Sequence, residues 1–197
     1  MSSPPAYTIR PGTEDDLPGI LEILNEQIAT STAIFTDDPL DIEDRRAWFR
    51  DLQKSGYPLY VAVPNPSPQS GGLSEPSSPS VDVLGFVAYG QFRSKPGYRF
   101  TVETSLYIHK DIRGGGVGSA LLRKIIDHTR EAGNVHVMVA GTAGNNIPSI
   151  RLHEKFGFEN SFTLKEVGYK FGEWQDVVFL TLKLPMDPSV ADGSARK

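Results

Sequence analysis

The segment Arg113-Gly-Gly-Gly-Val-Gly118 constrains the fold of this chain more than any other, because it joins a strand pattern to a helix pattern. Before it, residues 100–108 alternate between two sets of side chains, as a strand with one buried face does. After it, apolar residues recur at helical spacing from Val117 onward. Glycines let the backbone turn tightly with its N–H groups outward, next to the positive end of the helix dipole. The junction therefore predicts an anion-binding site, and a ligand that carries a phosphate is the one that it suits best.

The spacing of these glycines differs from that of two common phosphate-binding motifs. The Walker pattern needs a Lys-Ser or Lys-Thr pair after its last glycine, and the dinucleotide pattern is G-x-G-x-x-G with an acidic residue further on. The loop here is Arg-x-x-Gly-x-Gly. Taken alone, it is equally compatible with a plain glycine-rich turn between a strand and a helix.

Composition argues against several other classes of protein. The 197 residues carry a net charge of −4 and no long basic run, so the chain lacks the electrostatic footprint expected for nucleic-acid binding. It has no cysteine, and its four histidines show no zinc-ligand spacing. No apolar run approaches the roughly 20 residues that span a bilayer. We expect no metal, no nucleic-acid partner, no membrane association and a cytoplasmic location.

Periodicity along the chain predicts a mixed α/β sheet with helices packed on its faces. The expected order is β-α-α-β-β-β-α-β-α-β-β, which fits neither a TIM barrel nor a doubly wound fold. Strands are expected at 7–10, 59–63, 83–89, 100–108, 135–140, 162–167 and 177–184. Helices are expected from an Asp15 N-cap with Leu17, Ile20, Leu21, Leu24 and Ile28 inward, over 41–54, from Val117 to Gly133, and from an Asn146 cap to Gly157.

Residues 64–80 contain five prolines and six serines, and almost nothing that can be buried. Such a segment cannot offset the entropy lost on ordering, so it predicts a flexible insertion that is dispensable for folding. It interrupts a hairpin between 59–63 and 83–89 and does not separate two domains. We therefore expect one domain over 1–186 and a flexible tail at 187–197.

Three motifs in this order resemble the GNAT acetyltransferases. They are Leu106-Tyr-Ile108, the loop Arg113-x-x-Gly116-x-Gly118-Ser119, and Asn146-x-x-Ser149-x-x-Leu152-His153-Glu154-Lys155-x-Gly157-Phe158. The resemblance covers about 7–184 and implies the GNAT acyl-CoA N-acyltransferase fold, a mainly antiparallel sheet flanked by helices. Within the superfamily the chain is similar to the phosphinothricin acetyltransferase branch. That similarity rests on the segments 30–35 and 98–105, and on Gly168-Tyr-Lys-Phe-Gly-Glu-Trp-Gln-Asp-Val-Val-Phe179.

The resemblance implies transfer of an acetyl group from acetyl-CoA to the primary amine of a small amino acid analogue. Phosphinothricin, methionine sulfoximine and methionine sulfone are the acceptors that it suggests, with detoxification as the setting and a homodimer as the assembly. Two alternatives remain open. One is a regulatory module that binds acyl-CoA without turnover, and the other is an enzyme that acetylates a protein N-terminus or another amine.

The same resemblance implies which residues hold the co-substrate. Amides of the glycine loop would bind its pyrophosphate with Arg113 as an added cation, and the pantetheine arm would bond to the adjoining strand like an extra strand. Asn146 and Ser149 would contact the pantetheine. The expected set is Leu106, Tyr107, Ile108, Arg113, Gly114, Gly115, Gly116, Val117, Gly118, Ser119, Asn146 and Ser149.

Glu103 and His153 are the expected catalytic residues. An ammonium group must lose a proton before it can attack a thioester, and a carboxylate on the strand next to the thioester is a suitable base. The Y-x-F-T-x-E-T/S context favours Glu103 for this role over an acidic residue on the solvent face of a strand. His153 stands where many GNAT enzymes have a tyrosine that protonates the leaving thiolate, and an imidazole can supply that proton near pH 7. Because a thiolate already leaves well, a positioning role for His153 stays open.

Arg93, Lys95 and Tyr98 are expected to bind the acceptor. Two cations and a phenol suit a carboxylate together with a phosphinate, a sulfone or a second carboxylate. A solvated loop is the alternative. Relatives have Lys, then Arg, then Asn, whereas this chain has Arg, then Lys, then Pro, so its acceptor can differ from theirs. Phe35 is expected to pack on the aliphatic stem of the acceptor.

Overall fold

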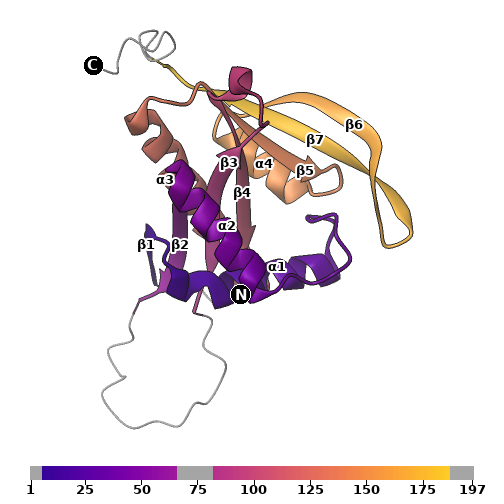
Figure 1. Ribbon diagram of the computed structural model, residues 1–197. Coiled ribbons are helices and arrows are strands. Elements are labelled where there is room, and N and C mark those ends of the chain that lie inside the picture. The colour runs from indigo at the N-terminus through magenta and orange to yellow at the C-terminus, as the bar shows by residue number, and fades with distance from the viewer. Residues whose placement is uncertain (1–5, 66–81, 187–197) are drawn as a thin grey trace, which may run out of the picture.

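The structure, a computed structural model, describes residues 6–65 and 82–186, which fold around one mixed sheet (Figure 1). Its seven strands lie in the order β1-β2-β3-β4-β5-β7-β6, and neighbours are antiparallel except for β4 beside β5. The expected fold class and order of elements are confirmed. Residues 66–81 of the insertion segment and the tail at 187–197 lie outside the described residues.

The bounds of the elements follow the sequence pattern closely at the centre of the sheet and less closely at its β6 end. The strands are β1 (Tyr7–Pro11), β2 (Leu59–Pro64), β3 (Gly85–Gln91), β4 (Thr101–Ile108), β5 (Val137–Ala143), β6 (Glu159–Lys170) and β7 (Glu173–Lys183). The helices are α1 (Leu17–Thr30), α2 (Ile42–Ser55), α3 (Val117–Ala132) and α4 (Ile147–Lys155).

Helices cover both faces of the sheet because its central strands send alternate side chains to opposite sides. Val87 packs in a core with α3 and the end of α4, whereas its neighbour Phe86 packs in a second core with α1 and α2. On β4, Val102 belongs to the α3 core and Tyr107 lies against the α1–α2 core. The predicted alternation of this strand is confirmed, and it places Glu103 on the α1–α2 side with Tyr107.

The start of α1 differs from the prediction. Glu14–Asp16 form a 3-10 turn, and the N-cap of α1 is Asp16, not Asp15. Asp16 is buried and receives two hydrogen bonds of 2.7 Å from the Arg10 guanidinium, so β1 holds this carboxylate at the helix start. The buried face of α1 is also rotated, because Ile23 is buried where Leu21 is only half-buried.

The strands β4 and β5 part after three residue pairs, and this parting creates the site described below. Thr101–Glu103 pair in parallel with Val137–Val139, after which β4 stays on β3 as far as Ile108 while β5 stays on β7 as far as Ala143. The hydroxyl of Thr104 donates to the Val139 carbonyl at 3.1 Å. This bond satisfies a backbone acceptor at the point where the sheet opens.

The β6–β7 hairpin is longer than predicted and extends away from the helices on the right of Figure 1. A bulge interrupts β6 between Leu164 and Gly168. There the backbone N–H of Glu166, which has a φ of 52°, donates to the carboxylate of Asp176 at 3.0 Å. Lys165 donates to the same carboxylate at 2.7 Å. Asp176 therefore fixes the bend of the hairpin.

Candidate active site

A cleft of about 910 Å³ lies between β4 and β5, where the two strands part. One wall is β4 from Thr104 to Ile108, and the other is β5 from Ala140 to Thr142. Because the two strands do not pair here, their facing edges offer backbone hydrogen-bonding groups to an extended ligand. A cleft of this size lies within the usual range for small-molecule sites.

The glycine loop closes one end of the cleft. Gly114 and Gly116 have φ angles of 83° and 82°, which side chains rarely adopt, so the loop requires glycine at both positions. The first bond of α3 runs from the Ala120 N–H to the Gly116 carbonyl. The N–H groups of the three residues between them have no acceptor inside the helix and are available to an anion.

The structure brings nearly all of the predicted co-substrate residues together in this cleft. Its lining includes Leu106, Tyr107, Ile108, Arg113, Gly114, Gly116, Val117, Gly118, Ser119, Asn146 and Ser149. Gly115 is not part of the lining. Its N–H donates to the Ile112 carbonyl at 3.3 Å, so this amide closes the turn before the loop.

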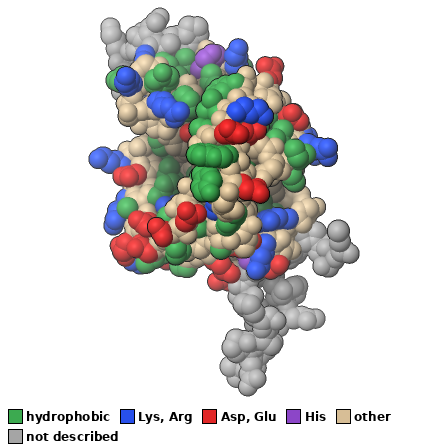
Figure 2. All heavy atoms as spheres, turned by 90° about the vertical axis from the view of Figure 1, so that its right-hand side faces the viewer, with side chains coloured by type: hydrophobic (Ala, Val, Ile, Leu, Met, Phe, Trp, Pro, Cys, Tyr) green, Lys and Arg blue, Asp and Glu red, His purple; other side chains and the backbone are tan. Residues whose placement is uncertain are grey.

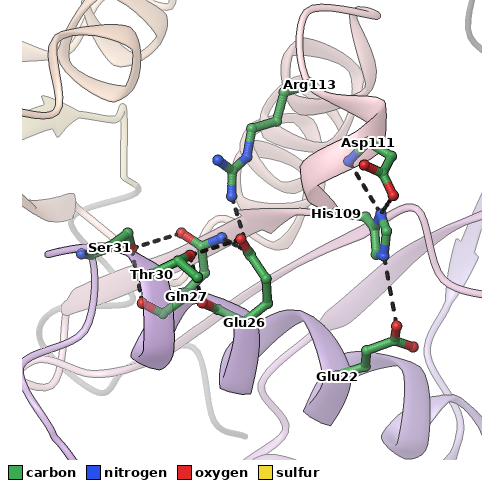
Figure 3. A network of polar contacts seen from close by, with 9 residues as sticks. Glu22, Glu26, Gln27, Thr30, Ser31, His109, Asp111 and Arg113 are labelled. Carbon is green, nitrogen blue, oxygen red and sulfur yellow. Dashed lines mark hydrogen bonds and ion pairs between the residues drawn. The ribbon is translucent and has the colours of Figure 1, made fainter.

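Figure 3 shows that Arg113 points across the cleft mouth toward α1. Its guanidinium lies 3.1 Å from a carboxylate oxygen of Glu26. The next turn of α1 supplies Gln27, Thr30 and Ser31 to the cleft lining. The α1 helix is thus a third wall of the cleft, and the sequence analysis did not predict it.

His153 lies in the cleft lining and is buried. Its Nδ1 is 2.9 Å from the carbonyl of Ser149, which can only accept, so Nδ1 carries the proton. Its Nε2 is buried and has no hydrogen-bond partner among the described residues. Burial lowers the pKa of His153, and the Ser149 bond acts against it. The imidazole is therefore neutral at pH 7, with an unprotonated Nε2.

Glu103 lies beside the point where the strands part and is half-buried. It is not part of the cleft lining, but its carboxylate lies 3.3 Å from where a β-carbon on Gly141, a lining residue, would stand. Burial raises the pKa of Glu103, and the charge of Arg93 partly opposes that rise. On the same face, burial and the nearby Glu103 raise the pKa of Tyr107 to about 12.

Three of the residues predicted to bind the acceptor are not part of the cleft lining and lie in the connection from β3 to β4. Arg93 stacks on Phe92 with its guanidinium carbon 4.3 Å from the ring centroid, and Tyr98 meets the same ring edge-on. Lys95 is exposed at the start of the short turn that carries Tyr98. Of these residues, Arg93 acts electrostatically on Glu103.

Phe35 lies apart from those three residues, in the segment that joins α1 to α2. Its ring atoms come within 3.0 Å of where a β-carbon on Gly168 would stand, so a side chain at Gly168 would collide with the ring. Next to it, the buried ammonium of Lys170 donates to the Ile34 carbonyl at 2.6 Å. Burial lowers the pKa of Lys170, and the charge of Asp37 opposes this. These contacts tie the β6–β7 hairpin to the α1–α2 segment.

Several cleft residues were not predicted from the sequence. The most informative are Thr104, Gly141, Asn145 and Phe171. Thr104 gave a usable signal, because it is a polar residue on the otherwise apolar face of its strand. Asn145 accepts from the Thr32 hydroxyl at 2.9 Å and so links the α1–α2 segment to the loop before α4. Only the tertiary structure shows that contact.

Residues 6–65 and 82–186 lack the features of two other kinds of site. No group of three or more His, Asp or Glu side chains is placed to hold a metal ion. No described helix is both long and apolar enough to cross a membrane.

The sequence and the fold of this chain are similar to those of known acetyltransferases. Residues 23–158 match the family model described as Acetyltransferase (GNAT) family. An L-methionine sulfoximine/L-methionine sulfone acetyltransferase of Pseudomonas aeruginosa is 41% identical over 182 residues, covering 92% of this chain and 96% of that protein. A phosphinothricin N-acetyltransferase of Streptomyces coelicolor is 33% identical over 172 residues, covering 87% and 92%.

A Salmonella typhimurium acetyltransferase, solved with its cofactor acetyl-CoA, has the same fold. Its TM-score is 0.81 at 38% identity, with 92% of this chain and 96% of that chain covered. The chain belongs to the GNAT family of acetyltransferases. The family and the fold predicted from the sequence are thereby confirmed.

Proposed function

We propose that this protein transfers an acetyl group from acetyl-CoA to the primary amine of a small amino acid analogue. Methionine sulfoximine, methionine sulfone and phosphinothricin are the acceptors that the relatives' names suggest. One observation carries the proposal. The parted strands and the glycine loop form a single cleft, and Glu103 lies where that cleft meets the face that bears Arg93.

The cleft fits acetyl-CoA by two features of the protein itself. The opened edge of β4 suits an amide-containing arm, and the N–H groups of Val117, Gly118 and Ser119 suit a pyrophosphate. A β-carbon at Gly114 or Gly116 would have nothing within 4 Å, so the space over the loop is open to a ligand. Acetyl-CoA supplies the acetyl group as a thioester, which an amine can attack directly.

Glu103 is the proposed general base. Its carboxylate, directly or through a water molecule, takes a proton from the acceptor's ammonium group and so frees the lone pair of the nitrogen. Burial favours this role, because it raises the pKa of the carboxyl group and makes the carboxylate a stronger base. The charge of Arg93 opposes part of this rise in the pKa.

His153 is proposed as a positioning residue at the thioester end of the cleft. The proton on its Nδ1 is committed to Ser149, and its Nε2 has none to give at neutral pH. A general acid would have to be protonated first, which burial opposes. A thiolate leaves without strong assistance, so the reaction tolerates this arrangement.

Arg93, Lys95 and Tyr98 are the proposed contacts of the acceptor's anionic groups. They lie between β3 and β4, outside the cleft lining, and the charge of Arg93 acts on Glu103. Phe35 is the proposed apolar contact, because it is exposed despite its packing on Gly168.

The alternatives named from the sequence are less well supported. In a module that only binds acyl-CoA, the half-buried carboxylate of Glu103 with its raised pKa would have no role. The cations at positions 93 and 95 argue against a polyamine as the acceptor. A protein N-terminus remains the second candidate within the enzyme class.

We also propose that the protein is a cytoplasmic homodimer. The β6–β7 hairpin exposes large apolar side chains at Phe162, Leu164, Val167, Tyr169, Phe171 and Trp174. Figure 2 shows a band of hydrophobic side chains on the face that includes this hairpin. Such a patch on an edge strand is typical of an interface. A cytoplasmic location follows the supply of acetyl-CoA, a charged metabolite made inside cells.

Glu103→Gln tests the activity and the base together in a thiol-release assay with acetyl-CoA and a panel of amino acids and sulfoximines. We expect the wild type to release thiol with methionine sulfoximine or phosphinothricin, and the variant to be about 10²- to 10⁴-fold slower. The wild-type kcat/KM should fall as the pH drops through the raised pKa of Glu103, so its acidic limb lies above the ordinary glutamate range. A variant with wild-type turnover would contradict the assignment.

Folding provides the control for that experiment. Because burial disfavours the charged form of Glu103, a neutral glutamine should not lower the melting temperature. Acetyl-CoA affinity should also stay near the wild-type value. Loss of either property would mean that the substitution disturbs the cleft and not the chemistry alone.

Gly116→Val tests the anion cradle. A side chain at a φ of 82° strains the loop, and its atoms would occupy the open space above it. We expect calorimetric titration of the folded variant to show no acetyl-CoA binding. Gly133→Val is a matched control, because Gly133 follows the other end of α3, also has a positive φ of 63°, and a β-carbon there also meets nothing within 4 Å. Retained affinity in Gly116→Val would place the co-substrate elsewhere.

Arg93→Ala combined with Lys95→Ala tests the acceptor contacts. We expect a higher KM for anionic acceptors, with each lost charged contact worth about 1.5–3 kcal/mol, and unchanged acetyl-CoA affinity. Loss of Arg93 should also move the acidic limb of the pH profile upward, because that charge lowers the pKa of Glu103. The exposed pair Arg50→Ala with Lys54→Ala on α2 is the charge-matched control. Unaltered kcat/KM would remove positions 93 and 95 from the site.

Trp174→Glu tests the homodimer. The Trp174 side chain is 64% exposed on the hairpin, so a charge there should break an interface without unfolding the monomer. We expect sedimentation to show a dimer for the wild type and for Ala47→Glu, an exposed position on α2, but a monomer for Trp174→Glu. A monomeric wild type at micromolar concentration would contradict the proposal.

A further inference from the structure

Arg113 has a partner that the proposed function does not use. Its Nη2 lies 3.1 Å from Oε2 of Glu26, and this ion pair joins the glycine loop to α1 across the mouth of the cleft (Figure 3). Two walls of the site are therefore linked by opposite charges. The cation that the proposed function assigns to a pyrophosphate is already neutralised by a carboxylate of this chain.

Glu26 is held in place for this contact. Its Oε2 also accepts a hydrogen bond from the side-chain amide of Gln27, and its Oε1 accepts from the Thr30 hydroxyl at 2.8 Å. The Glu26 side chain is only 19% exposed. Both carboxylate oxygens thus have donors from α1, so the negative charge stays where it is when Arg113 moves.

Charge explains why this arrangement matters. A pyrophosphate that enters between α1 and the glycine loop is attracted by the loop amides and by Arg113, but it faces a fixed carboxylate on the opposite wall. Arg113 cannot neutralise Glu26 and the ligand as fully as it neutralises either one alone. Glu26 can also help binding by orienting the Arg113 side chain. Arg113 is 51% exposed, however, and the orienting effect of such pairs is small.

We propose that Glu26 competes with the pyrophosphate of acetyl-CoA for Arg113, so that it weakens co-substrate binding and speeds the release of the product CoA. The inference rests on the proposed function of the glycine loop. Glu26 is a positioning residue in this scheme, since it acts through Arg113 and touches neither the acceptor nor the reacting atoms. After acetyl transfer, the ion pair between Glu26 and Arg113 forms again as CoA leaves.

Glu26→Gln tests the proposal, with Glu22→Gln as the matched control. Glu22 precedes Glu26 by one turn of α1 and lies 3.8 Å from His109, away from Arg113 (Figure 3). Both substitutions remove one negative charge from the same helix. We expect calorimetry at low salt to show acetyl-CoA and CoA binding about 3- to 10-fold tighter in Glu26→Gln, and nearly unchanged in Glu22→Gln. The gain should shrink as salt is added.

Two further probes separate competition for Arg113 from a general change in the cleft. S-Acetylpantetheine has the same thioester arm but no pyrophosphate, so its affinity, measured by competition against acetyl-CoA, should not improve in Glu26→Gln. In a protein that already carries Arg113→Met, the Glu26→Gln gain should also be much smaller. In steady-state assays, Glu26→Gln should show stronger product inhibition by CoA.

The outcomes distinguish this inference from the proposed function. Unchanged or weaker acetyl-CoA binding in Glu26→Gln, or an equal gain for S-acetylpantetheine, would overturn the competition. If Arg113→Met keeps wild-type affinity for acetyl-CoA, the assignment of Arg113 to the pyrophosphate fails first. If Arg113→Met binds weakly while Glu26→Gln matches the wild type, the cradle stands and only the role of Glu26 is lost.

Discussion

The parting of β4 from β5 is the constraint on which the rest of the site depends. A sheet that opens leaves backbone donors and acceptors without partners, which is unfavourable in a protein interior unless something satisfies them. Thr104 satisfies one of these groups at the apex by donating to the Val139 carbonyl. The remaining edges line a cleft that an extended, amide-rich ligand can fill. The glycine loop follows the same strand, so one structural irregularity brings the opened strand edges and the loop into a single cleft.

Burial acts in different ways on the two residues predicted to be catalytic. It raises the pKa of Glu103 and so favours a base, while it lowers the pKa of His153 and so opposes an acid. The hydrogen bond from His153 to Ser149 fixes the tautomer that withholds a proton from the cleft. In the proposed reaction Glu103 is therefore the one titrating group, and the leaving thiolate receives its proton without a dedicated donor.

Much of the fold could be predicted from the sequence because the central elements are periodic and bounded by glycines. The α3 helix spans Val117–Ala132 between the capping glycines Gly116 and Gly133, as its pattern indicates, and β4 alternates as expected. The prediction was weaker for β6, whose side chains are nearly all exposed and show no alternation. The α1 wall could not be predicted either. In the sequence, Glu26 and Gln27 cannot be distinguished from ordinary helix-surface residues. Only the tertiary structure shows that Glu26 pairs with Arg113 and that Gln27 lines the cleft.

The bond from Lys170 to the Ile34 carbonyl has a consequence for how the molecule responds to change. The β6–β7 hairpin exposes its outer side chains, and on its inner side this bond attaches it to the segment that carries Phe35. Through this bond a change at the outer surface would reach the segment that carries Phe35, and it would also reach the cleft, because Phe171 of the same hairpin lines it. Substitutions on the hairpin can therefore act on the α1–α2 segment and on the cleft together, so a directed-evolution screen that includes them has to follow the affinity for the acyl donor as well as the choice of amine.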